Sequence, residues 1–229
     1  MPIPPVKSLR EFIRDTLLER IARGELPPGQ RVVEATLVKE FSISATPVRE
    51  AIRELVAMGV LEAQNNKGAS VRQTRLHETI EAFQVRAALE TLAARGATPR
   101  LRGRGQALRQ AAEAIVEAAR CSDFAAFQEN NQTFHRSIVE AAGNSILLKT
   151  WDALFFQVRT RFTMDYLQKA DPVVIALEHV PIADALDHGD AKLAASLLAS
   201  HSNQLEEFLK QEQHRHLTTR NPIPELATS

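Results

Sequence analysis

Apolar residues recur at helical spacing through the first seventy positions and predict three helices. The first begins at a capping box formed by Ser8 and Glu11, in which each side chain can accept a hydrogen bond from the other residue's backbone N–H. A second helix is predicted at about 34–42. A third is predicted to start at Thr46 as the N-cap residue, with Pro47 at the first helical position.

The second and third helices are separated only by the short turn at 42–45. Two helices joined in this way, the second of them amphipathic, are typical of a helix-turn-helix. Two short segments with strand character follow, at 60–63 and 69–72, with a polar turn at 65–68 between them. A β-hairpin directly after a helix-turn-helix indicates a winged helix.

From residue 75 onward the pattern is helical and no strand pattern occurs. Capping residues and glycines predict helices at about 75–97, 106–120, 123–142, 146–168, 172–188 and 190–212. The expected fold class is therefore mainly α. A winged helix-turn-helix domain at 1–73 precedes an antiparallel six-helix bundle at 74–229, of which 213–229 is expected to be a poorly ordered tail.

Composition narrows the class of protein only in part. The single Cys121 excludes an internal disulfide, and no run approaches the roughly 18 apolar residues of a membrane span. Because the N-terminus also lacks the pattern of a secretory signal, we expect a cytoplasmic protein. The net charge is zero, and the first 72 residues hold eleven Lys/Arg against nine Asp/Glu. Affinity for DNA must therefore depend on where the cations lie.

Arg49 is the cation whose position is most informative. It is expected in the first turn of the third helix, where the macrodipole disfavours a cation by up to about 1 kcal/mol, and a bound anion would reverse that effect. Arg53 lies one turn later on the same face. The alternative is that Arg49 pairs with Glu50 or Glu54 as a solvated surface charge. Next to a helix-turn-helix and a wing, DNA binding is the favoured interpretation.

The histidines of the second half allow a metal site. Asn131 and His135 are four residues apart and share one helix face, while His179 and His201 lie on the last two predicted helices. For a single histidine, a hydrogen-bonded imidazole is the simpler interpretation. A helical bundle strengthens the case for a metal, because bundles build such sites from inward-facing side chains on facing helices.

Several motifs of the first half resemble the GntR family of regulators. The matching segments keep their order and are 24–29 (GELPPG), 41–52 (FSISATPVREAI), 59–61 (GVL) and 66–71 (NKGASV). The family commonly has an arginine before the matched Thr-Pro pair, where this chain has Ala45. The contact of that arginine with DNA is therefore absent, and the operator sequence of relatives cannot be copied onto this chain.

The resemblance also implies which residues meet DNA. Ser44, Thr46 and Arg49 would approach the duplex from the turn and the third helix, and the wing at Lys67 and Gly68 would reach the minor groove. A winged helix reads one half-site, so the expected partner is a pseudo-palindromic double-stranded operator bound by a homodimer.

Motifs of the second half resemble the FCD effector-binding domain of the FadR subfamily of GntR regulators. They are 85–90 (VRAALE), 131–135 (NQTFH) followed by 141–144 (AAGN), and 178–201, which begins with Glu-His and ends at a histidine. This resemblance implies that His135, His179 and His201 bind a divalent metal, with Asn131 as the fourth protein ligand.

Asn131 departs from the aspartate that many members carry at this position. Its amide is neutral, so three imidazoles and an amide leave the charge of the metal without compensation. We therefore expect a small carboxylate effector that binds partly to the metal, near Asn131. Arg86 is a candidate clamp for that carboxylate, although it could equally pair with Glu90 one turn on. Zn²⁺ suits a three-histidine site best, and Ni²⁺ and Mn²⁺ are alternatives.

The leading hypothesis is a ligand-responsive repressor that an organic acid releases from DNA. One alternative is a metal-dependent hydrolase, since three histidines with an open coordination position are also a hydrolytic site. That interpretation lacks a general base and leaves the N-terminal half unexplained. Another alternative is a regulator that senses an apolar acyl effector and holds no metal.

Overall fold

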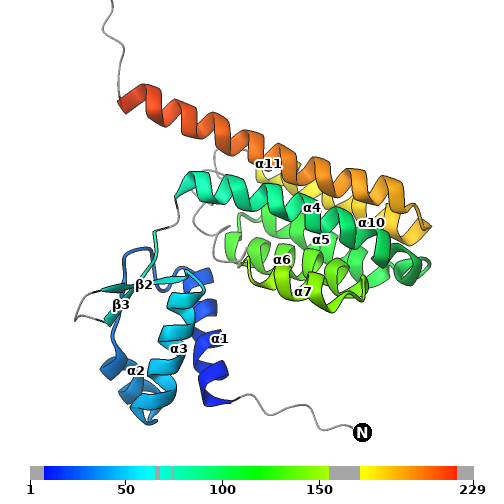
Figure 1. The fold of residues 1–229 in the computed structure, drawn as a ribbon. Helices are drawn as coiled ribbons and strands as arrows, with labels where there is room; N and C mark the ends of the chain where they lie inside the picture. Colours follow the sequence, from blue (N-terminus) through cyan, green and yellow to red (C-terminus); the bar gives the residue numbers. More distant parts are fainter. Residues whose placement is uncertain (1–7, 65–67, 74, 155–170, 221–229) are drawn as a thin grey trace, which may run out of the picture. The chain divides into compact units, whose positions relative to one another are not determined.

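The chain forms two compact units, Met1–Thr74 and Arg75–Ser229, in a computed structural model that describes residues 8–64, 68–73, 75–154 and 171–220 (Figure 1). Each unit has its own set of buried apolar side chains. Among the described helices, none is long and apolar enough to span a membrane.

Three helices form the body of the N-terminal unit: α1 (Leu9–Ala22), α2 (Glu34–Phe41) and α3 (Ala45–Ala57). The predicted capping box at Ser8 and Glu11 is confirmed, with both reciprocal hydrogen bonds present. The helices enclose a core of side chains that are at most 5% exposed: Ile13, Leu17, Ile21, Leu37, Val48, Leu55, Leu61 and Val71.

Helix α3 starts earlier than predicted. Its N-cap residue is Ser44 rather than Thr46, so Pro47 is the third helical residue. Proline fits there because the first four backbone N–H groups of a helix have no intrahelical acceptor. Arg49 is consequently the fifth residue of the helix, outside the first turn. The macrodipole argument for an anion at Arg49 is therefore wrong, since that effect fades within one turn.

The predicted hairpin is present as β2 (Leu61–Gln64) and β3 (Gly68–Val71), paired antiparallel with Leu61 opposite Val71. A short strand that the sequence did not indicate, β1 (Arg31–Val32), pairs with the other edge of β3 and gives the strand order β1-β3-β2. A strand of only two residues is too short to show an alternation of apolar and polar side chains, so the sequence pattern could not reveal it.

The second unit is entirely helical where it is described. Its helices are α4 (Leu76–Leu101), α5 (Gln106–Arg120), α6 (Phe124–Ala141), α7 (Ser145–Asp152), α9 (Pro172–Leu177), α10 (His179–His188) and α11 (Ala191–Arg220). The long helices α4 and α11 pack along each other, α5 and α6 pack together, and α4 also contacts α6 (Figure 1). One continuous apolar core joins these helices.

Two helices extend further than predicted. Helix α4 continues past Pro99 to Leu101, because a proline in the last turn removes only one of the final backbone hydrogen bonds. Helix α11 runs to Arg220, whereas a poorly ordered tail was expected from 213. Its inner face stays packed at Leu209 and Glu212, which are 0% and 1% exposed. Residues 155–168 of the predicted helix 146–168, and the tail beyond 220, lie outside the described residues.

The predicted helix 172–188 is divided at Glu178 into α9 and α10. Pro181 explains the break, because it has no N–H to donate to the carbonyl of Leu177 four residues earlier. The break places His179 at the first position of α10, and the carbonyl of Ala176 in α9 accepts from the backbone N–H of Glu178.

Candidate metal-binding and DNA-binding sites

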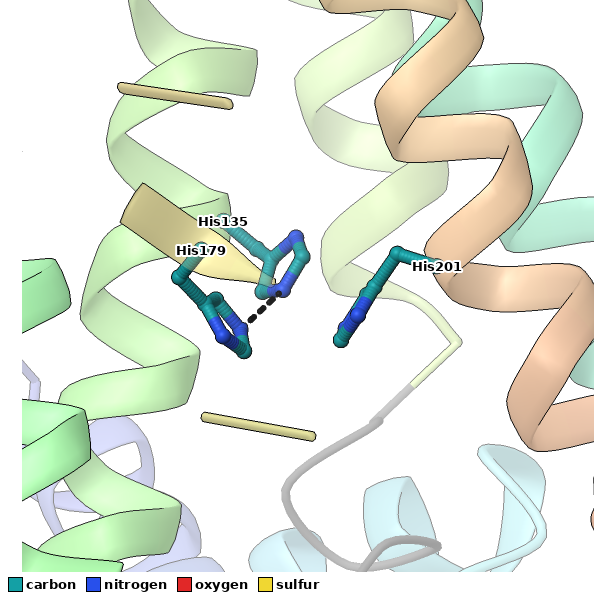
Figure 2. A group of neighbouring side chains, drawn as sticks. All are labelled: His135, His179 and His201. Atoms are coloured by element: carbon teal, nitrogen blue, oxygen red, sulfur yellow. Dashed lines mark hydrogen bonds between the residues drawn. The ribbon is translucent and has the colours of Figure 1, made fainter. Parts of the chain in front are cut away.

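Three buried histidines meet in the helical unit, and Figure 2 shows their imidazoles converging. His135 comes from α6, His179 from the start of α10 and His201 from α11. Each offers a ring nitrogen, and these atoms lie within 4.8 Å of one another. The Nε2 atoms of His135 and His179 are 3.2 Å apart. The structure thus brings together all three histidines that the sequence singled out.

The outer nitrogen of each imidazole is held by a separate acceptor. His135 Nδ1 lies 2.9 Å from a carboxylate oxygen of Glu90, and His179 Nδ1 lies 3.0 Å from the carbonyl oxygen of Ala176. His201 Nδ1 lies 2.6 Å from the carboxylate of Glu178. Since these partners accept hydrogen bonds, each ring carries a proton on Nδ1, which in a neutral imidazole leaves the lone pair at Nε2. Histidine ligands of metals are held in this way.

Burial keeps two of these histidines neutral. It lowers the pKa of His135 to about 4, where repulsion by the Arg86 guanidinium adds to burial and the bond to Glu90 opposes it. Burial, together with the neighbouring histidines, holds the pKa of His179 well below 6.5. Neutral imidazole is the form that binds a metal, so no proton has to leave these rings near pH 7.

Asn131 completes the cluster. Its Oδ1 atom lies 2.9 Å from His179 Nε2, so the amide oxygen faces the lone pair of the imidazole. Two pairs of acceptor atoms therefore lie within 3.2 Å of each other, an arrangement that a shared cation relieves. Nitrogen ligands at about 2.1 Å from one zinc ion lie about 3.0–3.4 Å apart. The donors of Asn131, His135 and His179 thus lie at or near the spacing that suits one divalent ion, and the ring nitrogen that His201 offers lies within 4.8 Å of those of the other two histidines.

Glu90 on α4 connects the histidines to the buried polar groups around them. One carboxylate oxygen accepts from His135, and the other accepts from Arg86 Nε at 2.7 Å and from the indole N–H of Trp151 at 3.0 Å. The Arg86 guanidinium lies over the ring of Phe83. Burial would raise the pKa of Glu90, but Arg86 and His135 outweigh it and hold that pKa well below its usual range.

Arg86 therefore pairs with Glu90, the alternative that the sequence left open. The expectation that the protein supplies no charge to balance a metal is also wrong. Glu90 and Glu178 each lie one hydrogen bond beyond a candidate ligand. With the positive charge of Arg86, these side chains carry one net negative charge, which leaves a divalent ion and its surroundings at +1.

Sequence reasoning missed most of these supporting residues. Glu90 was considered only as a partner of Arg86, and Glu178 only as part of a motif. A usable signal existed at Pro181, since it predicts the break that places His179 at the first position of α10. The partners on α4 and α7 depend on how the helices pack, which no spacing along the chain reveals.

The residues expected at DNA occupy the surface of the N-terminal unit. Ser44, Thr46, Arg49 and Arg53 are exposed on the turn and on α3. Gly68, the first residue of β3, is exposed as well and has a φ of 87° that favours glycine. Lys67 lies outside the described residues.

Arg49 has an acidic partner that the sequence analysis did not consider. Its Nε and Nη2 atoms lie 3.1 Å and 2.7 Å from the two carboxylate oxygens of Glu34, the first residue of α2. The alternative in which Arg49 pairs with Glu50 or Glu54 therefore names the wrong partner. The hydrogen bonds from Arg49 lower the pKa of Glu34, and Glu34 in turn raises the pKa of Arg49.

A winged helix-turn-helix followed by an all-helical unit defines a class of bacterial transcription regulators with separate DNA-binding and helical domains. Two family models match the chain in this order: residues 9–71 match "Bacterial regulatory proteins, gntR family", and residues 81–204 match the FCD domain. The chain belongs to the gntR family of bacterial regulatory proteins and carries an FCD domain.

Individual relatives agree with this assignment. The chain is 40% identical over 190 residues to the "Probable D-xylose utilization operon transcriptional repressor" of Paenarthrobacter nicotinovorans, covering 82% of this chain and 83% of the relative. It is 26% identical over 209 residues to the HTH-type transcriptional repressor GlaR of Escherichia coli, covering 89% of each. The solved structure of E. coli McbR/YncC shares the fold, with a TM-score of 0.78 at 24% identity over 91% of this chain and all of that one.

These matches confirm the predicted fold class. They also place the protein among transcription regulators and not among enzymes, which removes the hydrolase alternative.

Proposed function

We propose that this protein is a ligand-responsive repressor that binds a pseudo-palindromic operator as a homodimer and is released by a small organic acid. Asn131, His135, His179 and His201 would hold a divalent metal, with Zn²⁺ as the best fit to three imidazoles. The metal would supply an open coordination position for a carboxylate. Effector binding would favour an arrangement of the DNA-binding units that fits the operator less well, a coupling worth about 1–3 kcal/mol.

One observation carries the metal part of this proposal. Each of three converging histidines has its Nδ1 atom fixed by an acceptor, and each has a ring nitrogen within 4.8 Å of a ring nitrogen of the other two. Three imidazoles arranged only for packing would more simply donate to one another. An apolar acyl effector with no metal, the remaining alternative, gives no reason for this common tautomer.

The charges around the site favour an effector with a single carboxylate. A divalent ion surrounded by Glu90, Glu178 and Arg86 leaves a net charge of +1, which one carboxylate neutralises. Arg86 is already paired with Glu90, so we propose that it assists the carboxylate through the field of its charge. A ligand with two or three carboxylates would bring excess negative charge into a buried space.

The first experiment is a thermal melt of the full chain, loaded with Zn²⁺ or treated with EDTA, against a panel of small acids. Because the relative from Paenarthrobacter nicotinovorans is named a probable D-xylose utilization operon transcriptional repressor, the panel includes D-xylose and D-xylonate, a neutral sugar and its monocarboxylate. Glycolate, benzoate and citrate complete it. Ligands that bind the folded state raise the melting temperature by mass action.

We expect at least one monocarboxylate to raise the melting temperature of the zinc-loaded protein and to have no effect after EDTA. A neutral sugar that acts equally with and without metal would contradict the metal-anchored carboxylate. Stabilisation by acyl compounds alone, insensitive to EDTA, would support the metal-free alternative.

Replacing Asn131 by Asp tests the charge argument directly. The N131D variant adds one negative charge next to the metal, so we expect tighter zinc binding and at least about tenfold weaker binding of the monocarboxylate. Isothermal titration with zinc and then with the acid measures both. Tighter zinc binding with unchanged affinity for the acid would show that the site's net charge does not select the effector.

The homodimer is tested separately. Sedimentation of the protein alone, and with a duplex selected by it from a random library, gives the mass of each species. We expect two protomers on a duplex whose selected sequence repeats as an inverted pair. One protomer on an asymmetric sequence would contradict the proposal.

A further inference from the structure

The ion pair between Arg49 and Glu34 has an unusual location for a surface contact. It joins the first residue of α2 to an exposed residue of α3, the helix expected to face DNA. The Arg49 and Glu34 side chains remain 53% and 33% exposed. The guanidinium of Arg49, which we expect to contact DNA, is therefore already bound to a carboxylate in the DNA-free protein.

The two hydrogen bonds use one particular edge of the guanidinium. Nε and Nη2 face the two carboxylate oxygens of Glu34. Within the described part of the chain, Nη1 of Arg49 has no partner, and the outer edge formed by Nη1 and Nη2 remains available. Glu34 therefore fixes the plane of the guanidinium through one bidentate edge, and the other edge can still donate two hydrogen bonds.

The outer edge suits two kinds of acceptor on a duplex. An arginine can donate two parallel hydrogen bonds to O6 and N7 of a guanine or to two oxygens of a phosphate. A free arginine must give up the motion of a long side chain to make such a contact, whereas one held at its inner edge has already lost much of it. The shared requirement is a pair of acceptor atoms presented end-on.

We propose that Glu34 is a positioning residue for DNA binding, which orients the outer edge of Arg49 toward a pair of acceptor atoms on the duplex. The inference rests on the proposed function only in placing Arg49 at the DNA. It predicts a sign opposite to that of simple electrostatics. Removing a carboxylate from a DNA-binding surface reduces repulsion of phosphates and should tighten binding, whereas losing a positioning residue should weaken it.

A second glutamate on the same helix provides the matched control. Glu40 on α2 is ion-paired with Arg20 of α1, and its side chain is 39% exposed. The variants Glu34→Ala and Glu40→Ala each remove one negative charge from α2 and one arginine partner. They differ in whether that arginine lies on α3 or α1.

The experiment measures binding of the full-length protein to two fluorescent duplexes by anisotropy, over a series of salt concentrations. One duplex is selected by the wild type from a random library, and the other is a scrambled version of it. The proteins are wild type, E34A, E40A, R49Q and the double variant E34A/R49Q. A thermal melt of each verifies that the N-terminal unit is folded.

We expect E34A to bind the selected duplex about three- to tenfold more weakly, while E40A binds equally or slightly more tightly. In the R49Q background the Glu34 substitution should cause no further loss. If the acceptors are on a guanine, the loss is confined to the selected duplex. If they are on a phosphate, binding to both duplexes weakens and the salt dependence becomes shallower.

Other outcomes overturn the proposal in distinguishable ways. If E34A binds as tightly as wild type or more tightly, Glu34 does not position Arg49, even where R49Q binds weakly. If R49Q itself binds DNA as tightly as wild type does, Arg49 does not contact the DNA. The part of the proposed function that places Arg49 at the operator then fails as well.

Discussion

Two arginine–glutamate pairs illustrate how differently the two units use the same chemistry. In the helical unit the side chains of Arg86 and Glu90 are 2% and 1% exposed, and Glu90 has further partners in His135 and Trp151. In the N-terminal unit Arg49 and Glu34 make a two-bonded pair whose side chains are 53% and 33% exposed. The first pair belongs to a buried hydrogen-bond network that solvent does not reach. In the second pair, water or a ligand can replace either partner.

The difference follows from solvation. Water can replace either partner of an exposed pair, so such a pair contributes about 0–1 kcal/mol and can be given up to a ligand at small cost. A buried charge has no such substitute, and losing its partner leaves it uncompensated. A surface that must bind and release DNA suits the first kind of pair. A site that must hold several ligands in place suits the second.

The largest expected change in stability comes from removing Glu90 from its buried hydrogen-bond network. Replacing Glu90 by Ala leaves Arg86 buried without its carboxylate partner, and we expect about 3–5 kcal/mol of destabilisation. Urea unfolding of EDTA-treated protein measures this without a contribution from metal. The E34A variant is the matched exposed case. A loss below about 1 kcal/mol for E90A would show that water or a rearranged side chain replaces the carboxylate.

Metal removal should have the next largest effect. Zinc that binds only the folded state stabilises it by about 2.7 kcal/mol at one hundred times its dissociation constant. We expect the difference between zinc-loaded and EDTA-treated protein to vanish in His201→Ala and to persist in His188→Ala. His188 is exposed at the end of α10 and donates to a backbone carbonyl, so it serves as the control histidine. Equal zinc stabilisation in both variants would place the metal elsewhere.

The smallest effect is expected for the exposed pair. We expect Glu34→Ala to change the free energy of unfolding by no more than about 1 kcal/mol, because both side chains are solvated in the folded protein. Urea unfolding gives this value alongside that of E90A. A cost of several kcal/mol would mean that the pair fixes α2 against α3 and that its effect on DNA binding is a consequence of folding.

The sequence alone predicted the elements whose signals are local. The capping box at Ser8, the hairpin after the helix-turn-helix and the helices of the second unit follow from spacing and capping residues. The three histidines were also singled out, because their motifs resemble those of a known domain. Their convergence required the packing of α6, α10 and α11.

Features that depend on contacts between distant segments were not predictable. The partner of Arg49 lies fifteen residues away on another helix, whereas spacing suggested its immediate neighbours. Glu90 meets His135 across 45 positions of the chain, and β1 becomes a strand only because β3 pairs with it. Pro181 was an overlooked local signal, and with it the division of α9 from α10 was missed.

The position of Trp151 gives the protein an optical sensor of its own. It is the only tryptophan in the sequence and is 1% exposed, with its indole donating to the same carboxylate that receives His135. Indole emission responds to the charges around the ring, so a cation drawn to His135 should alter it. Because the N-terminal unit has no tryptophan, this fluorescence follows events in the helical unit alone. Ligand occupancy and DNA release can thus be recorded from unlabelled protein and labelled DNA in the same cuvette.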